Sequence, residues 1–128
     1  MFNIKSRINS TWGGNLVDMV RCERFLEVID EDRLVDNAAT VGAHLLKGLE
    51  QWAGEYPAQL MNARGKGLMC AIEFKDPALR DAVSRKAYEL GMIILSCGHA
   101  SLRFRPPLDV TADEIDEALG LLRRALVA

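Results

Sequence analysis

The sequence predicts an α+β domain, in which an antiparallel sheet of three to four strands is covered by helices and preceded by a long helix. Three observations support this prediction. Residues 16–55 carry apolar side chains at helical spacing, whereas short apolar runs separated by glycine begin at residue 60. Two more helical patterns, each opened by a capping signal, then alternate with short strand-like segments.

Two helices open the expected fold. The first covers residues 16–29, where charged side chains separate apolar ones that recur at helical spacing, namely Leu16, Met19, Val20, Leu26 and Ile29. The second covers residues 34–52. It should end near Gly54, because glycine with Pro57 close behind it is a frequent signal at a helix C-terminus.

A β-hairpin is expected next. Residues 60–63 and 68–74 are short and apolar, and the segment Arg64–Gly67 between them has glycine at alternate positions. The backbone amides of such a segment can form an anion-binding nest with a basic rim. Alternate glycines are also what a tight hairpin requires, and we favour the turn.

A third helix is expected after the hairpin. Asp76 followed by Pro77 is an N-cap and first-turn pair, and an apolar stripe continues from there to Gly91. Residues 92–95 and 101–105 then read as two more strands.

The last element should be a fourth helix. Pro106 and Pro107 end the preceding strand, because proline has no N–H to donate to a sheet. Thr111 and Glu114 then form a capping box ahead of an apolar helical stripe.

The composition is that of an ordinary soluble globular protein. Hydrophobic residues make up 49% and charged residues 27%, with a formal net charge of -2. This mixture gives no indication of binding to nucleic acid or to an anionic membrane. No apolar run reaches the length of a signal peptide or a membrane-spanning helix, so we expect a protein of the cytoplasm.

The cysteines do not indicate a disulfide framework or a zinc site. Cys22, Cys70 and Cys97 are odd in number, widely spaced and without a CxxC pair. His99 lies two residues after Cys97, but two potential ligands do not make a metal site. We therefore expect no bound metal.

The segment Ser10–Asn15 places two hydroxyls and a glycine pair directly before the first helix. A helix N-terminus offers free backbone N–H groups and the positive end of a dipole, and glycine lets an anion come close. The pattern therefore suits a phosphate. The alternative is that Ser10 or Asn15 only caps the helix while the glycines form a turn, and spacing alone favours this alternative.

Two arginines alternate with apolar residues in the last expected strand. Leu102 and Phe104 should face the core, so that Arg103 and Arg105 share the opposite face. A planar guanidinium binds a carboxylate through two parallel hydrogen bonds, which makes these arginines candidates for a substrate clamp. For either arginine taken alone, a solvated strand face is the simpler interpretation.

Three segments together resemble the last third of the class III aminotransferases. They are INSTWGGN near the start, RGKGLMCAIEF in the middle and LRFRPPLDVTADEID near the end, in the order and spacing of that family. Within the family the sequence is most similar to the L-lysine 6-aminotransferases, because Trp12 is present, no proline follows Asn15, and RFRPPL carries Arg105.

The resemblance implies a fold and a domain division. The chain would be the small carboxy-terminal domain of a fold-type I transferase that depends on pyridoxal 5'-phosphate (PLP). Residues 1–15 would form the tail of the large cofactor-binding domain, and residues 16–128 the small domain. The parent enzyme would be a homodimer.

The resemblance also implies roles for particular residues. Thr11 would hydrogen-bond the cofactor phosphate of the neighbouring subunit, with Ser10 and Asn9 close enough to support that contact. Arg103 would bind the carboxylate of the substrate, whereas the family supplies no role for Arg105.

The implied reaction transfers the 6-amino group of L-lysine to 2-oxoglutarate, giving 2-aminoadipate 6-semialdehyde and glutamate. The lysine that forms the Schiff base with PLP lies upstream in the family. None of the lysines in this chain matches it, namely Lys5, Lys47, Lys66, Lys75 and Lys86. We therefore expect no catalytic residue in this chain, and no activity from it alone.

Two other functions remain open at this point. One is a different ω-aminotransferase of the same class, acting on ornithine, acetylornithine or 4-aminobutyrate, because most residues that select the amino donor would lie upstream. The other is a stand-alone α+β domain that binds a small anion or dimerises without catalysis.

Overall fold

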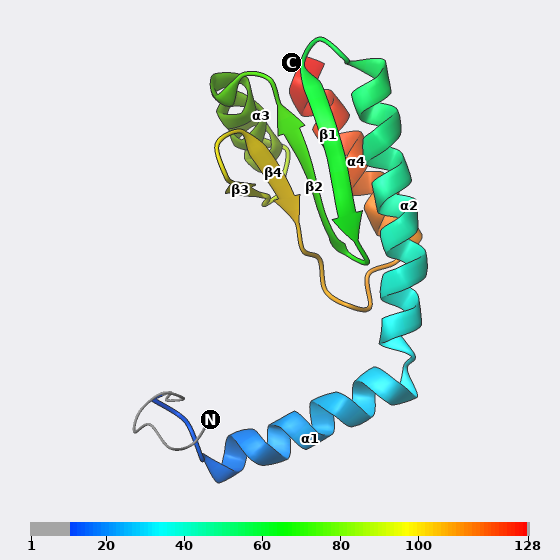
Figure 1. Cartoon of the computed structure of the whole chain (residues 1–128), viewed down its shortest axis with the longest axis vertical. Coiled ribbons are helices and arrows are strands. Elements are labelled where there is room, and N and C mark those ends of the chain that lie inside the picture. The colour runs from blue at the N-terminus through cyan, green and yellow to red at the C-terminus, as the bar shows by residue number, and fades with distance from the viewer. Residues whose placement is uncertain (1–10, 128) are drawn as a thin grey trace. The chain divides into compact units, whose positions relative to one another are not determined.

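The structure, a computed structural model, describes residues 11–127 of the chain. The chain divides into two compact units, Met1–Leu34 and Val35–Ala128. Helices and strands follow one another in the predicted order (Figure 1), with the bounds α1 Leu16–Glu31, α2 Leu34–Glu55, β1 Leu60–Lys66, β2 Met69–Phe74, α3 Pro77–Glu89, β3 Leu95–Cys97, β4 Ser101–Phe104 and α4 Ala112–Val127.

Helix α1 is the main element of the first unit. None of its residues is buried, and apolar side chains such as Leu16 and Val20 are 75% and 66% exposed. The charged side chains of the helix form ion pairs with one another, for example between the guanidinium of Arg24 and the carboxylate of Glu27 at 2.8 Å. The predicted amphipathic pattern is therefore present in α1, but its apolar residues are exposed.

The four strands form one antiparallel sheet in the order β1-β2-β4-β3. Strand β4 lies between β2 and β3, where Arg103 is paired with Ala71 on one side and with Leu95 on the other. A bulge interrupts β1 between Met61 and Arg64. The predicted α+β class with a small antiparallel sheet is confirmed.

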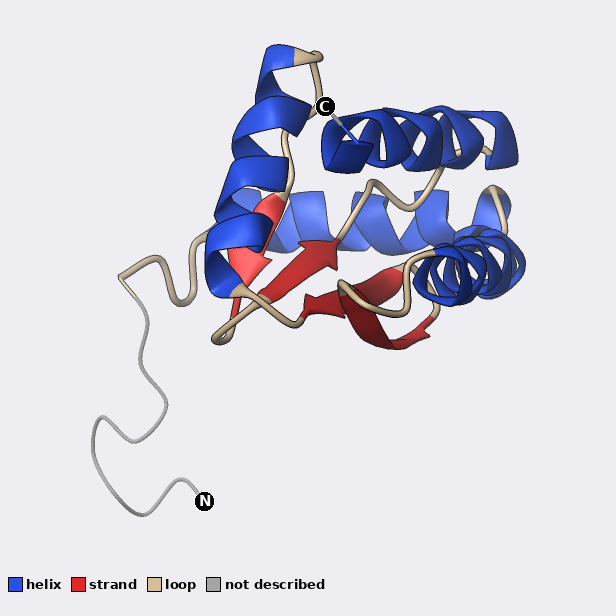
Figure 2. Cartoon of the chain, turned by 90° about the horizontal axis from the view of Figure 1, so that it is seen from above, coloured by secondary structure: helices blue, strands red, loops and turns tan. Residues whose placement is uncertain are grey.

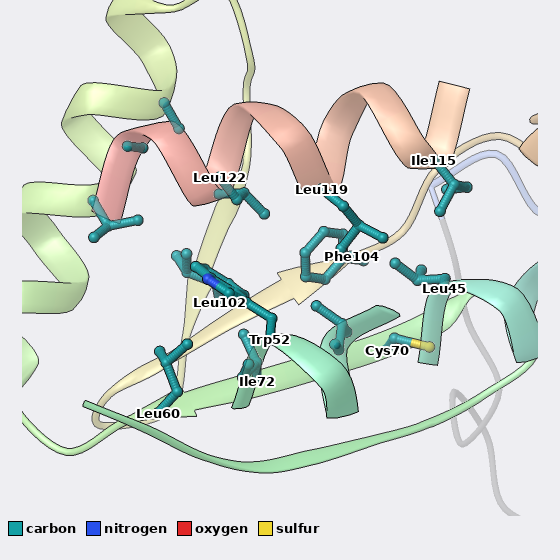
Figure 3. Packing of buried hydrophobic residues seen from close by; sticks show 14 of the residues in the cluster. Leu45, Trp52, Leu60, Cys70, Ile72, Leu102, Phe104, Ile115, Leu119 and Leu122 are labelled. Carbon is teal, nitrogen blue, oxygen red and sulfur yellow. The ribbon is translucent and has the colours of Figure 1, made fainter. Parts of the chain in front are cut away.

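Helices α2, α3 and α4 cover one face of this sheet (Figure 2). Their apolar side chains meet the inward residues of the strands in a single core (Figure 3). Trp52 of α2 packs edge-on against Phe74 of β2, with ring centroids 6.1 Å apart and an interplanar angle of 81°. Leu102 and Phe104 are buried in the same core, as the alternation in β4 predicted.

Strands β1 and β3 differ most in extent from the prediction, whereas β2 begins one residue later than expected and β4 ends at Phe104, one residue before the expected Arg105. Strand β1 continues through Arg64, Gly65 and Lys66, which pair with β2, so the hairpin turn is shorter than expected. Strand β3 begins only at Leu95, because the backbone N–H of Met92 donates to the carbonyl of Ala87 and completes the end of α3 instead of joining the sheet. In both cases backbone hydrogen bonding sets the bound of the strand.

A backbone contact joins α2 to the β1–β2 hairpin. Gly42 of α2 lies against Gly67, whose φ of +55° is in the left-handed region. A Cβ atom at Gly42 would overlap the carbonyl group of Gly67, and neither backbone can yield as a flexible side chain would. Glycine at 42 therefore lets the helix approach the hairpin closely.

The capping predictions hold at the starts of α3 and α4. Asp76 accepts a hydrogen bond from the backbone N–H of Ala78 at 2.9 Å, with Pro77 in the first turn. Thr111 and Glu114 cap each other, because the N–H of Thr111 donates to Glu114 at 2.8 Å and the N–H of Glu114 donates to the Thr111 hydroxyl at 3.3 Å. These hydrogen bonds lower the pKa of Glu114 from its ordinary value.

Among the residues described, no helix is long and apolar enough to span a bilayer.

The Gly42–Gly67 contact leads to a paired test. We expect Gly42→Ala to destabilise the protein by about 1–3 kcal/mol, the usual cost of forcing a group into a packed site. Gly54→Ala is the matched control, because a Cβ at Gly54 meets nothing within 4 Å. It should be neutral or stabilise by up to about 1 kcal/mol, since alanine is the better helix former. Urea denaturation of both variants measures the difference, and equal stabilities would contradict the steric account.

Candidate functional site

A cavity of about 340 Å³ lies at the edge of the sheet, entirely within the second unit. Three segments meet there: residues 92–95 before and at the start of β3, residues 103–106 at the end of β4, and the first turns of α4. Most of its walls are apolar, including Ile94, Phe104 and Ile115. A small apolar cavity with a few charged groups is the usual form of a small-molecule site.

Arg103 is the half-buried charged residue of this cavity. It stands on the sheet face opposite Leu102 and Phe104, next to the small side chain of Ala71. Its Nε atom is buried and has no hydrogen-bond partner among the described residues. An N–H group in that position costs free energy until an acceptor satisfies it, and a carboxylate can do so together with the rest of the guanidinium.

Arg105 and Glu114 complete the charged lining. Arg105 is exposed, and it forms no ion pair or hydrogen bond with another described residue. The carboxylate of Glu114 accepts hydrogen bonds from Thr111 and remains ionised at neutral pH, because these bonds lower its pKa. The charged residues that line the cavity are thus Arg103, Arg105 and Glu114, and the Glu114 carboxylate is already engaged by Thr111.

The sequence alone did not identify the walls of this cavity. Glu114, Ile115 and Ala118 were assigned to a capped amphipathic helix, and residues 92–95 to a strand. These residues lie near Arg103 only because α4 packs against the sheet. The spacing of apolar residues within one segment cannot predict such a contact. Only the alternation that sets Arg103 apart from Leu102 was visible in the sequence.

The turn at Thr11–Gly14 lies in the first unit. Asn15 is the N-cap of α1, and its side chain accepts a hydrogen bond from the N–H of Val17 at 2.9 Å. Asp18 places a carboxylate in the same first turn. The N-terminus of α1 is therefore already occupied by a cap and an acidic residue, which makes it less suited to a phosphate than the sequence suggested.

Thr11 keeps a hydroxyl available for a ligand. The residue is exposed and makes no hydrogen bond with another described residue. Gly14, with a φ of +81° and open space around it, leaves the adjacent backbone accessible. Asn9 and Ser10, the other predicted cofactor contacts, lie outside the described residues.

The segment Arg64–Gly67 does not form an anion site. Arg64 donates to the carbonyl of Asn62 at 3.0 Å and to the Ser101 hydroxyl at 3.3 Å, and it lies 3.8 Å from the carboxylate of Glu73. Its charge is thus engaged on the sheet. The interpretation as a hairpin is confirmed.

Other residues with possible chemistry have structural contacts. His44 of α2 and Asp116 of α4 lie 2.7 Å apart and link two helices. Cys70 is buried, and its burial raises the pKa of the thiol, which makes it less reactive. Over residues 11–127, no group of three or more histidine, cysteine or acidic side chains could hold a metal ion.

Comparison with known proteins gives a consistent result. The family model for class-III aminotransferases matches residues 2–126. The L-lysine-epsilon aminotransferase of Amycolatopsis lactamdurans is 48% identical over all of this chain, which covers 29% of that protein. An acetylornithine aminotransferase of Gloeobacter violaceus is 37% identical over 88% of this chain and 28% of its own length.

A solved structure agrees with both the sequence and the fold. The lysine aminotransferase of Mycobacterium tuberculosis superposes with a TM-score of 0.88 and 44% identity, covering 97% of this chain and 28% of that one. The chain thus spans less than a third of the length of the relatives that it matches.

Proposed function

This chain belongs to the class-III aminotransferase family, and we propose that it is the carboxy-terminal part of an enzyme that transfers the 6-amino group of L-lysine to 2-oxoglutarate. The products would be 2-aminoadipate 6-semialdehyde and glutamate. The proposal rests on Arg103, a half-buried residue that lines a largely apolar cavity. Its Nε atom is buried and has no hydrogen-bond partner among the described residues. The greater identity to lysine aminotransferases than to the acetylornithine enzyme supports lysine as the amino donor.

Arg103 would bind and orient the substrate. Two parallel hydrogen bonds from its guanidinium to a carboxylate fix both the position and the plane of that group. The apolar walls around it, among them Phe104 and Ile94, exclude water from part of this interaction and strengthen it. The arginine thus holds the bound substrate in one orientation, and this positioning accelerates a reaction at the neighbouring carbon.

The family uses PLP, and one described residue fits the needs of its phosphate. A phosphate needs hydrogen-bond donors, and the exposed hydroxyl of Thr11 next to the open turn at Gly14 fits that need. Thr11 would bind the cofactor phosphate of the neighbouring subunit, supported by Ser10 and Asn9. When bound, PLP supplies an electron sink for the bonds broken at the substrate carbon.

The rest of the catalytic machinery would lie upstream. None of the lysines in this chain matches the residue that forms the Schiff base in the family. Residues 1–15 would form the tail of the large domain and residues 16–128 the small domain. The complete enzyme would act as a homodimer in the cytoplasm, and this chain alone would be inactive.

The choice of amino donor gives a direct test. In the complete polypeptide that carries this chain, we expect L-lysine to give the highest kcat/KM, because the motifs and the identities favour lysine enzymes. Ornithine, acetylornithine and 4-aminobutyrate should be at least about tenfold poorer, a difference that about 1.4 kcal/mol of transition-state binding provides. A preference for one of these three would identify another ω-aminotransferase, and no transfer from any of them would favour a non-catalytic domain.

Removal of the guanidinium tests the role of Arg103. In the same enzyme, Arg103→Ala should weaken 2-oxoglutarate binding by about 2–5 kcal/mol, the range for losing one partner of a buried charge pair. Arg85→Ala is a matched control, because Arg85 is an exposed arginine of α3 and does not line the cavity. Unchanged affinity in Arg103→Ala would exclude the carboxylate contact.

Removal of a hydroxyl tests Thr11. We expect Thr11→Ala to lose about 1–3 kcal/mol in PLP retention, because a hydrogen bond to a charged group is one of several anchors for the phosphate. Thr11→Ser keeps the hydroxyl and should retain the cofactor much better. Equilibrium dialysis of the holoenzyme, followed by PLP absorbance, measures the difference, and equal retention in both variants would leave Thr11 with no phosphate contact.

A further inference from the structure

Asn37 of α2 binds the β4–α4 loop, residues 105–111, which joins the last strand to the last helix. Its side-chain NH2 group donates to the carbonyl of Leu108 at 2.8 Å and to the carbonyl of Val110 at 3.0 Å. These partners lie 71 and 73 residues away in the sequence, so no pattern within one segment indicates the contact. The proposed function assigns no role to Asn37.

The β4–α4 loop needs donors from outside its own backbone. Pro106 and Pro107 have no N–H, and the N–H of Val110 reaches the carbonyl of Pro107 only at 3.3 Å. Val110 is buried, and a carbonyl at a buried position costs free energy unless a donor satisfies it. An asparagine amide has two N–H bonds to donate, so the single side chain of Asn37 satisfies both carbonyls.

The helix that carries Asn37 is held in place on two sides. Val41 and Leu45, further along α2, are buried in the core. Gly42 lies against the backbone of Gly67 in the β1–β2 hairpin. Because this part of α2 cannot shift without disturbing close-packed contacts, the two hydrogen bonds tie the loop to a rigid support.

The β4–α4 loop connects two walls of the Arg103 cavity. Arg103 precedes the loop at the end of β4, and Ile115 follows it in α4. Pro106 and Val110, within the loop, line the cavity as well, whereas Asn37 does not. Asn37 therefore acts on the cavity from outside, by fixing the path of the loop between the two walls.

We propose that Asn37 is a positioning residue for the Arg103 cavity: through the β4–α4 loop it holds the cavity walls in the geometry in which Arg103 binds a carboxylate. The inference rests on the proposed function, because that function gives Arg103 its carboxylate ligand. An oriented contact between a guanidinium and a carboxylate tolerates little displacement. A residue that supports the walls thus affects binding without touching the ligand.

Removal of the amide tests this role in the complete holoenzyme. Asn37→Leu keeps the approximate shape of the side chain and removes both donors without adding a charge. We expect it to raise the Kd of 2-oxoglutarate by about three- to tenfold, because a small displacement of the walls weakens an oriented contact. Titration calorimetry without an amino donor measures this Kd, since no amino group is transferred.

A double-mutant cycle separates positioning from a general loss of stability. If Asn37 acts through Arg103, adding Asn37→Leu to Arg103→Ala should raise the Kd no further, because both residues then contribute to one contact. A purely structural role gives the same additional loss in both backgrounds. Such additivity, or an unchanged Kd in Asn37→Leu alone, overturns the inference. If Asn37→Leu does not fold, Asn37→Ser, which keeps one shorter donor, takes its place in the same cycle.

Gln51→Leu is the matched control. Gln51 is exposed on the same helix and does not line the Arg103 cavity, and the change again replaces an amide with leucine. Its Kd for 2-oxoglutarate should stay at the wild-type value, and an equal rise in both variants overturns the inference. Amide hydrogen exchange of residues 105–111 should become faster in Asn37→Leu but not in Gln51→Leu, and unchanged exchange in Asn37→Leu contradicts the support of the loop.

Binding and turnover together separate this inference from the proposed function. If lysine is not transaminated but Asn37→Leu weakens 2-oxoglutarate binding only where Arg103 is present, the proposed function fails and the inference stands. If lysine is transaminated normally and Arg103→Ala weakens binding but Asn37→Leu does not, the inference fails and the function stands.

Discussion

The alternation of side chains along β4 is the constraint on which the rest of the site depends. Leu102 and Phe104 are fully or almost fully buried beneath the helices, and this burial fixes which face of the strand meets the core. Arg103, between them, must then stand on the other face. A slip of one residue in register would bury the arginine and expose two large apolar side chains, so the core itself sets the direction of the guanidinium.

The sequence predicted the fold well because its signals are local. Each helix carries its own apolar period, and α3 and α4 also carry side-chain caps that the structure confirms, such as Asp76 and the Thr111–Glu114 pair. The strand bounds were less accurate, because an apolar residue such as Met92 fits both a strand and a helix end, and only the hydrogen bond to Ala87 decides between them.

The candidate site was predictable only in part, for a physical reason. The residue types and the alternation identified Arg103, but the cavity wall on α4 is formed by residues distant in sequence, and periodicity carries no information about such contacts. At the start of α1 the structure has the helix cap that spacing alone favoured, with Asn15 as the N-cap. The N-terminus of α1 is capped by Asn15 and carries Asp18, so the hydroxyl of Thr11, and not the helix dipole, is what remains for a phosphate.

The buried Nε atom of Arg103 has a consequence for how this sequence can evolve. An orphaned donor destabilises the unliganded fold, and an apolar residue of similar size would remove that penalty. Selection for folding alone therefore acts against the arginine, whereas selection for carboxylate recognition preserves it. A lineage that lost the carboxylate ligand would be expected to replace Arg103 early, while Leu102 and Phe104 on either side stayed apolar.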